Sequence, residues 1–575
     1  MTDLQQLIEL GKAPSWMTTE GYTTLRGGYL LEGEEPVDMY RRVANAAARR
    51  LKRADLEDPF FNLMWRGWLG LATPVAANMG TERGLPISCY ALYVEDDMTA
   101  IRESWNEVAA LSSKGGGVAV HLNDIRAKGS SIGSGGKSEG VVPWAKVYDS
   151  ITIAVSQNAV RRGATALYLD AEHGDIEEFL RIRRPLGDVN RQCLNVHHGV
   201  SISDDFMNRV KSGDSEARRI WADILKTRVE TGEPYLFFSD NVNNANPQCY
   251  KDKGLFVLGS NLCTEVFGVT DKEHSFVCCL SSMNLAKRDE WKNTDAVYLA
   301  TLFLDAVMEE FIIKAKKIPG FERAVNFAMK SRMLGLGVMG YHTYLQEHSI
   351  PFESEQAQSL NQEIFQSLQE QTQRASRDLA KEYGEPEWCK GYGIRNTHLT
   401  ACAPTKSNSL ICGNVSAGIE PIAANYILKK EAKGDFIYRN PTLAKLLQDL
   451  GKDTPETWQQ ILNDGGSVQS LDFLIDHQKE VFKTAREIDQ MELVQQAAAR
   501  QPYIDQGQSL NLFFRIGEDP NVINRVHFTA WKAGLKTLYY CRSEEAQKVR
   551  TTAVSTTEAA ACSIENKDDC LACQG

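Results

Sequence analysis

The sequence predicts an α/β protein, because segments typical of buried strands are followed by long amphipathic helices. Residues 71–200 contain short apolar runs separated by glycines, such as 115–120 and 164–169, and runs of this kind are typical of buried strands. Residues 295–317 and 355–383 instead repeat apolar side chains at helical spacing. With 43 % hydrophobic and 24 % charged residues, the 575-residue chain has the composition of a globular protein with a large core.

Helices are predicted on both sides of the strand-rich region. Behind Pro36, placed as an N1 proline, apolar residues recur at helical spacing: Val37, Tyr40, Val43, Ala44, Ala47 and Leu51. We therefore expect residues 1–84 to form a helical segment. Both later helices have a stop signal, Pro319-Gly320 for the first and Gly384 for the second.

The last third of the chain changes character twice. Residues from about 430 to 500 are polar with helical patterning, so we expect a helical excursion from the main domain, which we place at 85–545. Residues 546–575 have no periodicity and few large apolar groups, which predicts a flexible tail.

Charge and patterning exclude several classes of protein. The net charge is −11, from 64 basic and 75 acidic residues, which argues against a general nucleic-acid surface. No apolar run approaches 18 residues, so we expect no membrane-spanning helix. Residues 1–6 have neither the basic nor the apolar region of a secretion signal, so we expect a cytoplasmic protein.

The 13 cysteines are then available for packing, metal binding or chemistry. The most specific segment holds Asn261, Cys263 and Glu265, at alternate positions. In an extended loop these three side chains project to the same side and present an amide, a thiol and a base together. The alternative is a buried packing cysteine in a turn beside a solvated Glu265.

Other cysteines lie in two kinds of context. Cys89 and Cys278 each end an apolar run, where a thiol can face a pocket or simply fill the core. Cys570 and Cys573 form a CxxC motif in the polar tail, a spacing that suits a reversible disulfide. A zinc site that adds Cys562 is the alternative, although structural zinc usually needs four protein ligands.

Together, these segments resemble the large, catalytic subunit of class I ribonucleotide reductase. The resemblance runs from about Gly27 to the C-terminus and includes the segments 502–511 and 536–540. It implies a ten-stranded α/β barrel with Cys263 on a central finger loop.

The resemblance also implies roles for the residues of this loop and the paired thiols. Cys263 forms a transient thiyl radical that abstracts the 3′ hydrogen of the ribose, Glu265 takes the proton of the 3′ hydroxyl, and Asn261 holds the sugar hydroxyls. Cys89 and Cys278 supply the reducing equivalents and end as a disulfide, while the neighbouring Cys279 is a bystander.

The implied partners follow from two further pairs. Tyr539 and Tyr540 relay the radical from a separate, ferritin-like, metal-containing small subunit, because the chain itself shows no cluster of carboxylates and histidines for a metal centre. We therefore expect no metal or cofactor in this chain. Cys570 and Cys573 carry electrons from thioredoxin or glutaredoxin to the active-site disulfide.

Nucleotide contacts are implied in two places. The resemblance implies that a ribonucleoside diphosphate substrate contacts Asn261 and Glu265. It implies further substrate contacts at Thr73, Ser88, Pro404, Thr405, Lys406 and Ser407. It also implies that an effector, a deoxynucleoside triphosphate or ATP that selects the substrate, contacts Asp96, Arg126, Gln157 and Arg161. The resemblance implies a homodimer that depends on this effector. The family's sequence after its N-terminal ATP-cone starts here at residues 25–30, so we expect no ATP-cone. Taken alone, each of the two phosphate segments favours a plain loop over a binding site.

Two rival functions stay open at this point. A class II relative uses adenosylcobalamin in a single chain and lacks the Tyr539-Tyr540 pair. A non-catalytic, nucleotide-binding redox sensor uses the CxxC of the tail as its switch, and its Cys263→Ala variant behaves like the parent.

Overall fold

A computed structural model of the chain describes residues 3–133, 135–155, 163–185, 187–431 and 434–543. One sheet has the strand order β13-β6-β5-β4-β3-β2-β7. Its five central strands are parallel, and the two outer strands are antiparallel to their neighbours. The strands are β2 (Cys89–Tyr93), β3 (Gly117–His121), β4 (Thr165–Asp170), β5 (His197–Ile202), β6 (Tyr235–Phe238), β7 (Phe276–Cys278) and β13 (Thr537–Leu538).

Further strands and extended segments close this sheet into a barrel. After one residue β7 continues into β8, which pairs in parallel with β9; Leu336 of β9 pairs with Thr400, and Cys402 pairs with Gln508. The N–H of Tyr539 then donates to the carbonyl of Leu510 at 2.9 Å, which leads back to β13. The α/β prediction is confirmed, since five parallel strands and five extended segments of opposite direction form a ring. The strands here are β1 (Leu69–Leu71), β8 (Leu280–Asn284), β9 (Gly335–Met339), β12 (Leu512–Phe514) and β14 (Cys541–Ser543).

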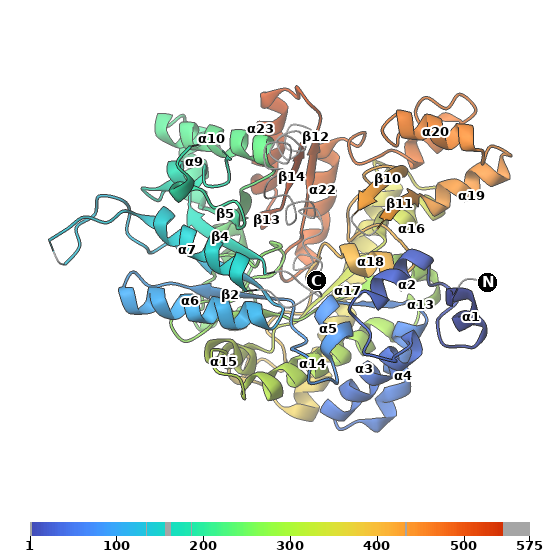
Figure 1. Ribbon diagram of the computed structural model, residues 1–575, viewed down its shortest axis with the longest axis horizontal. Helices are drawn as coiled ribbons and strands as arrows, with labels where there is room; N and C mark the ends of the chain where they lie inside the picture. Colours follow the sequence, from blue (N-terminus) through green and yellow to red (C-terminus); the bar gives the residue numbers. More distant parts are fainter. Residues whose placement is uncertain (1–2, 134, 156–162, 186, 432–433, 544–575) are drawn as a thin grey trace.

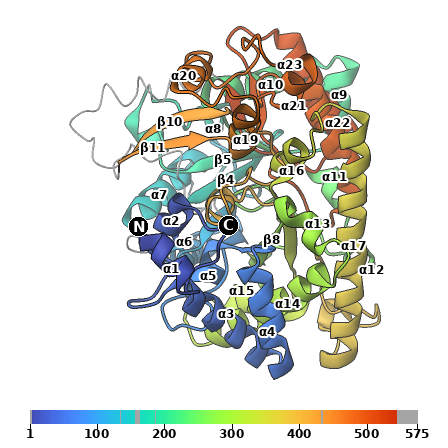
Figure 2. The same ribbon diagram turned by 90° about the vertical axis from the view of Figure 1, so that its right-hand side faces the viewer.

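Helices cover the outside of the barrel (Figure 1). The predicted starts and stops are confirmed for three of them, α3 behind Pro36, α14 and α17, and α17 ends at Gly384 with φ +82°. Figure 2 shows α17 running along one side of the molecule. The helices are α1 (Asp3–Glu9), α2 (Thr19–Arg26), α3 (Pro36–Arg50), α4 (Glu57–Trp65), α5 (Thr73–Asn78), α6 (Met98–Ser113), α7 (Val141–Ala154), α8 (Ile176–Phe179), α9 (Asp204–Ser212), α10 (Ser215–Thr231), α11 (Ser239–Asn244), α12 (Gln248–Asp252), α13 (Arg288–Trp291), α14 (Ala296–Ala315), α15 (Glu322–Ser331), α16 (Tyr341–Glu347), α17 (Glu355–Tyr383), α18 (Lys406–Ile411), α22 (Gln490–Arg500) and α23 (Pro520–Lys532).

A smaller unit projects from the barrel at the upper right of Figure 1. It contains a hairpin, β10 (Tyr426–Glu431) with β11 (Gly434–Arg439), and three helices, α19 (Pro441–Asp449), α20 (Pro455–Asn463) and α21 (Asp476–Val481). It has its own hydrophobic core, which includes Leu443, Leu447, Trp458, Ile461 and Phe482. The polar helical segment expected from the sequence therefore divides in two, because α22 packs into the main core through Leu493 and Val494.

The most apolar long helix, α14, is buried in the main core. It carries Asp305 and Glu310, which pair with arginines, and such an all-round apolar helix is typical of a core position. Within the described ranges, no helix combines the length and the apolar character needed to cross a membrane.

Candidate active site

The finger loop is a tight hairpin inside the barrel. Ser260 pairs with Phe267, and the N–H of Asn261 donates to the carbonyl of Val266 at 3.1 Å. The turn is closed by Thr264, whose φ of +66° lies in the left-handed region that few threonines adopt. The expected extended loop is therefore wrong, although the turn still brings Asn261 and Glu265 together.

Side-chain hydrogen bonds of Asn261 hold this turn. Its Oδ1 accepts the backbone N–H groups of Glu265 at 3.0 Å and of Val266 at 3.1 Å, and its Nδ2 donates to Glu265 Oε2 at 2.9 Å. Tyr168 donates its hydroxyl to the Asn261 carbonyl at 3.0 Å. The amide thus has a structural role in addition to any role with a ligand.

Neighbouring barrel segments anchor the finger loop through hydrogen bonds. Ser509 donates its hydroxyl to the carbonyl of Cys263 at 2.6 Å, and Thr537 donates to the carbonyl of Thr264 at 2.7 Å. The N–H of Gly507 donates to the carbonyl of Glu265 at 2.8 Å, and Gln506 Oε1 accepts the N–H of Phe267 at 2.9 Å. These hydrogen bonds stabilise the turn and offset the cost of its left-handed backbone conformation.

Glu265 is a buried acid with a perturbed pKa. It is 1 % exposed and also accepts a hydrogen bond from Ser509 at 3.3 Å. Burial, followed by the nearby Cys89, raises the pKa of Glu265 to about 8. The solvated Glu265 of the alternative interpretation is therefore wrong. An acid poised near neutrality in a closed site is typical of a catalytic base.

Cys89 and Cys278 lie directly opposite each other in the antiparallel pair of β2 and β7. Both are buried, and neither is part of a disulfide in this structure. Opposite residues of an antiparallel pair have Cα atoms about 4.5–5.5 Å apart, inside the range that a disulfide spans. Burial, and then the hydrogen bond with Cys89, raise the pKa of Cys278 well above its ordinary value.

The next cysteine along the strand behaves differently. Cys279 points its thiol at the carbonyl of Leu304 on α14, at 3.4 Å, as expected for the opposite face of the strand. Ser88 precedes Cys89, and its N–H donates to the carbonyl of Cys278 at 3.4 Å.

A cluster of three tyrosines lies at the end of β13, the strand that anchors the finger loop. Tyr539 and Tyr540 follow β13, whose Thr537 anchors the loop, and their ring centroids are 4.3 Å apart. Tyr235, at the start of β6, contacts both rings at 4.8 and 5.0 Å. The guanidinium of Arg542 lies 4.1 Å from the Tyr540 ring centroid. Sequence reasoning missed Tyr235, because only the pairing of β6 with β13 brings it here.

The predicted substrate-phosphate residues lie at the starts of two short helices. Thr73 begins α5, and its hydroxyl hydrogen bonds with that of Tyr29 at 3.0 Å. Pro404 and Thr405 precede α18, which begins with Lys406 and Ser407. Thr405 has φ +47°, and its hydroxyl accepts the N–H of Gly418 at 2.7 Å. Helix α18 packs on α2 and on β1, and β1 is followed after one residue by α5.

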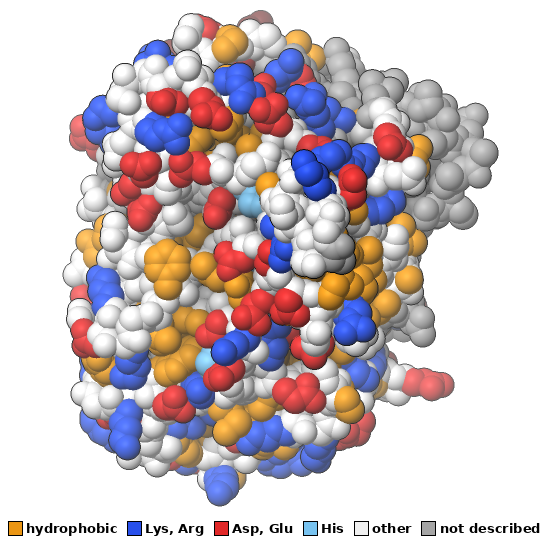
Figure 3. All heavy atoms as spheres, turned by 90° about the vertical axis from the view of Figure 1, so that its left-hand side faces the viewer, with side chains coloured by type: hydrophobic (Ala, Val, Ile, Leu, Met, Phe, Trp, Pro, Cys, Tyr) orange, Lys and Arg blue, Asp and Glu red, His pale blue; other side chains and the backbone are white. Residues whose placement is uncertain are grey.

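Two of the four predicted effector residues lie among the residues that the structure describes. Asp96 and Arg126 form an ion pair of 2.6 Å at the surface, so a carboxylate and a guanidinium lie side by side there. Gln157 and Arg161 lie outside the described residues, as do Cys570 and Cys573 of the tail. On the face shown in Figure 3, the described acidic and basic side chains are interspersed.

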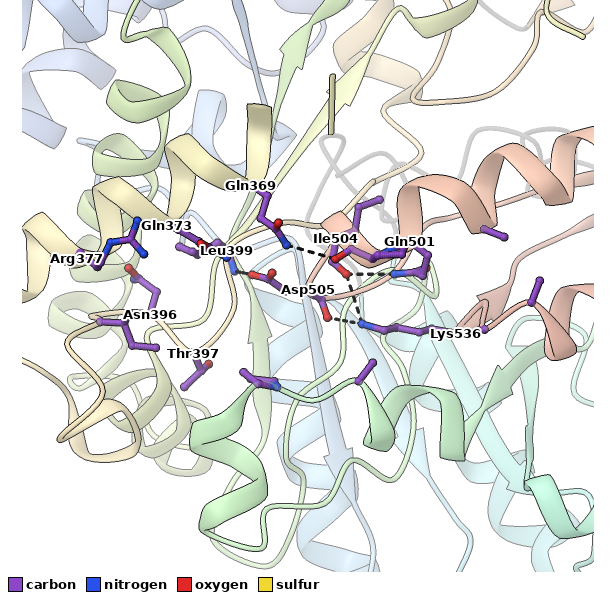
Figure 4. A pocket seen from close by; sticks show the side chains of 17 residues that line it. Gln369, Gln373, Arg377, Asn396, Thr397, Leu399, Gln501, Ile504, Asp505 and Lys536 are labelled. Carbon is purple, nitrogen blue, oxygen red and sulfur yellow. Dashed lines mark hydrogen bonds between the residues drawn. The ribbon is translucent and has the colours of Figure 1, made fainter. Parts of the chain in front are cut away.

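A cavity of about 590 Å³ lies next to the anchors of the finger loop (Figure 4). Its lining includes Gln501, Asp505 and Lys536, the last two directly preceding Gln506 and Thr537 in the chain. Lys536 is buried and donates to the carbonyls of Ile504, at 3.4 Å, and Asp505. Burial lowers the pKa of Lys536 to about 8. Among the described residues that line this cavity there is no cysteine, so it is separate from the thiols.

Across the described ranges, no group of three or more His, Cys, Asp or Glu side chains is placed to hold a metal ion.

Comparisons with known proteins agree along the chain. Residues 16–84 match a family model described as the all-alpha domain of ribonucleotide reductase, and three overlapping matches over 87–541 fit its barrel domain. A ribonucleoside-diphosphate reductase large subunit of Frog virus 3 is 42 % identical over 91 % of this chain and 93 % of its own length. One of Invertebrate iridescent virus 3 is 33 % identical, over 96 % and 98 %.

A solved structure has a similar fold. The class Id ribonucleotide reductase alpha subunit of Actinobacillus ureae superposes with a TM-score of 0.87 and is 44 % identical, over 93 % of this chain and 98 % of that one.

Proposed function

This chain belongs to the large-subunit family of ribonucleotide reductases, and we propose that it reduces ribonucleoside diphosphates with a radical that forms on Cys263. As a ribonucleoside-diphosphate reductase large subunit it is an oxidoreductase. The observation that carries the assignment of residues is the convergence of Asn261, Cys263 and Glu265 in one buried hairpin beside the facing thiols of Cys89 and Cys278.

The first step is the activation of the ribose. Acid–base groups do not break a C–H bond of a sugar, so a radical is needed, and its site must exclude water. Cys263 is 1 % exposed, which suits a thiyl radical that takes the 3′ hydrogen. Glu265 then accepts the proton of the 3′ hydroxyl, and Asn261 donates to the sugar hydroxyls.

The second step is the reduction. The 2′ hydroxyl leaves as water, and Cys89 and Cys278 supply two electrons and two protons as they form a disulfide. At the end of the cycle Cys263 returns the hydrogen to the 3′ carbon and becomes the thiyl radical again, so the radical is not consumed. The facing positions of the two thiols support this assignment, because little movement is needed to join them.

The radical and the electrons come from outside the barrel. We assign Tyr540 and then Tyr539 as the relay from a radical-generating, metal-containing small subunit to Cys263. The contact of the two rings supports this order, since Tyr539 is nearer in the chain to the strand that anchors the finger loop. We assign Cys570 and Cys573 as the pair that passes electrons from thioredoxin or glutaredoxin to the oxidised Cys89 and Cys278.

Nucleotide recognition completes the proposal. Ser88, Thr73 and the turn of Pro404, Thr405, Lys406 and Ser407 hold the substrate, with its diphosphate at the turn. Asp96, Arg126, Gln157 and Arg161 bind a deoxynucleoside triphosphate or ATP that selects the substrate in a homodimer. We assign residues 1–84 to a helical segment, 85–545 to the catalytic barrel and 546–575 to the redox tail.

The test is the reduction of CDP by this chain with and without its cognate small subunit. We expect dCDP only when both subunits are present. Formation of dCDP by this chain with adenosylcobalamin alone contradicts the relay, and absence of turnover under every condition, with nucleotides still bound, favours the redox sensor.

A further inference from the structure

A pair of a half-buried histidine and a buried carboxylate lies against the tyrosine cluster. His197 Nδ1 is 2.7 Å from Glu233 Oε1, and the Glu233 side chain is fully buried. The other carboxylate oxygen accepts the backbone N–H of His198 at 3.1 Å and lies 3.4 Å from Arg183 Nε. Burial alone would raise the pKa of Glu233, but Arg183 and His197 bring it well below its ordinary value, so the carboxylate is ionised.

An ionised Glu233 fixes the tautomer of His197. A carboxylate only accepts hydrogen bonds, so Nδ1 must carry a proton, and the lone pair of a neutral ring is then at Nε2. A buried carboxylate orients a histidine in the same way in hydrolase triads. The pair thus holds the Nδ1–H of His197 on Glu233 and fixes the orientation of the ring.

The rings next to His197 are tyrosines. The imidazole stacks on Tyr235 at 5.9 Å and 25°, and it meets Tyr540 edge-on at 6.1 Å. Strand pairing explains this arrangement. The register of β5 with β6, continued by two residues, places His197 beside Glu233. The register of β6 with β13, continued by one residue, places Tyr539 opposite Tyr235.

We propose that His197, held by Glu233, is a positioning residue of the tyrosine relay and acts through its contacts with Tyr235 and Tyr540. This inference rests on the proposed function, because it presupposes that Tyr539 and Tyr540 carry the radical. A tyrosine gives up its phenolic proton with its electron and regains both on reduction, so the transfer depends on how the phenol is oriented and on the acceptors around it. His197 in a fixed tautomer keeps that surrounding constant from one turnover to the next.

The test uses the full chain with its small subunit. Glu233→Gln keeps the shape of the side chain and removes its charge, and we expect it to lower kcat for CDP about tenfold while KM stays unchanged. His197→Gln places an amide near the position of Nε2, whereas His197→Asn replaces only Nδ1. We therefore expect the first variant to retain more turnover than the second.

A spectroscopic arm separates positioning from simple packing. With 3-aminotyrosine at position 540, a tyrosine analogue that is easier to oxidise, the trapped radical can be measured by electron paramagnetic resonance. We expect the yield of this radical to fall in the Glu233→Gln background. The matched control is Tyr341→Phe, which removes a buried hydroxyl that donates to Gln496 at 3.0 Å outside the tyrosine cluster and should leave both readouts unchanged.

The outcomes distinguish a failure of the tyrosine relay from a failure of the positioning role of His197. If Tyr540→Phe turns over like the parent, the relay of the proposed function is wrong. If Tyr540→Phe is inactive but the Glu233 and His197 variants match the parent in kcat and radical yield, or change only KM, the positioning role is wrong and the relay stands. If Glu233→Gln fails to fold, the two His197 variants decide, since they leave the Glu233–Arg183 pair in place.

Discussion

Glu265 illustrates how burial sets chemistry at the scale of one residue. Its carboxyl group is closed off from water and held by Asn261 and Ser509, and its pKa is raised to about 8. The neutral acid is therefore the dominant form at neutral pH, and the group becomes a base only as the pH rises. The same shift affects folding, because a native state that retains this proton loses stability as the pH rises from the unfolded pKa toward 8.

A pH profile tests this description of Glu265. If the ionised form accepts the 3′ hydroxyl proton, kcat/KM falls as the pH drops below about 8, since this parameter reports the free enzyme. Glu265→Gln should lower kcat by about 10²–10⁴-fold and remove this limb from the residual activity. It should also unfold at a higher denaturant concentration than the parent at pH 8, because no buried charge forms. A variant with parental turnover and an unchanged acid limb contradicts the role of Glu265.

Sequence reasoning reached most of these residues but not their geometry. The alternation of Asn261, Cys263 and Glu265 and the resemblance together point to one site, and the structure brings Asn261 and Glu265 into contact. The tight turn was not predictable, because it needs the left-handed conformation of Thr264, which threonine rarely adopts by itself. The roles of Gln157, Arg161 and the tail cysteines stay predictions.

At the scale of elements, the finger loop depends on the barrel segment of residues 506–509. Gly507 donates to the loop through its backbone, and it has no side chain where the loop passes. A Cβ atom at this position would lie 2.4 Å from Cζ of Phe267, closer than real contacts allow. The absence of a side chain at Gly507 therefore lets the hairpin approach its anchor.

We expect Gly507→Ala to displace the finger loop. The ring of Phe267 has to move, and overpacking of this kind typically costs about 1–3 kcal/mol of stability. Because the hairpin carries Cys263, kcat should fall at least about tenfold, a change worth 1.36 kcal/mol in the barrier. Gly133→Ala is the control, since a Cβ there meets nothing within 4 Å. CDP turnover and chemical unfolding measure the two effects, and equal activity of both variants would disprove the dependence.

Local patterns predicted the elements that local interactions form. The helix behind Pro36 and the helix ending at Gly384 follow from spacing and capping residues, and both are present. The hairpin of β10 and β11 and the separate core around Trp458 were not predicted, because they depend on contacts between segments that a periodicity does not encode. The position of Tyr235 was missed for the same reason.

At the scale of the whole molecule, the barrel joins parts of the site from distant segments. Cys89 comes from the first strand of one half and Cys278 from the strand that starts the other half. The finger loop precedes that strand, and Tyr539 and Tyr540 come from the last segment of the ring. A closed ring is what makes residues separated by 450 positions, from Cys89 to Tyr539, parts of one proposed path.

The proposed redox tail gives a prediction at this scale. Cys570→Ser combined with Cys573→Ser should stop repeated turnover with thioredoxin but leave about one dCDP per active site, because Cys89 and Cys278 can each be oxidised once. Cys193→Ser is a matched control, since this buried cysteine lies on no proposed electron path, and it should turn over repeatedly. Rapid-quench counting of dCDP distinguishes the cases, and loss of the first turnover in the double variant would mean that the tail has another role.

The most direct test of the account concerns the thiol of Cys263. The Cys263→Ser variant is to be combined with the small subunit, an effector nucleotide, thioredoxin and CDP, and dCDP is to be counted while CDP binding is measured in parallel. The account predicts that CDP still binds and that no dCDP forms, not even in a first turnover, because a serine hydroxyl does not form the hydrogen-abstracting radical. Formation of dCDP by this variant would contradict the central claim.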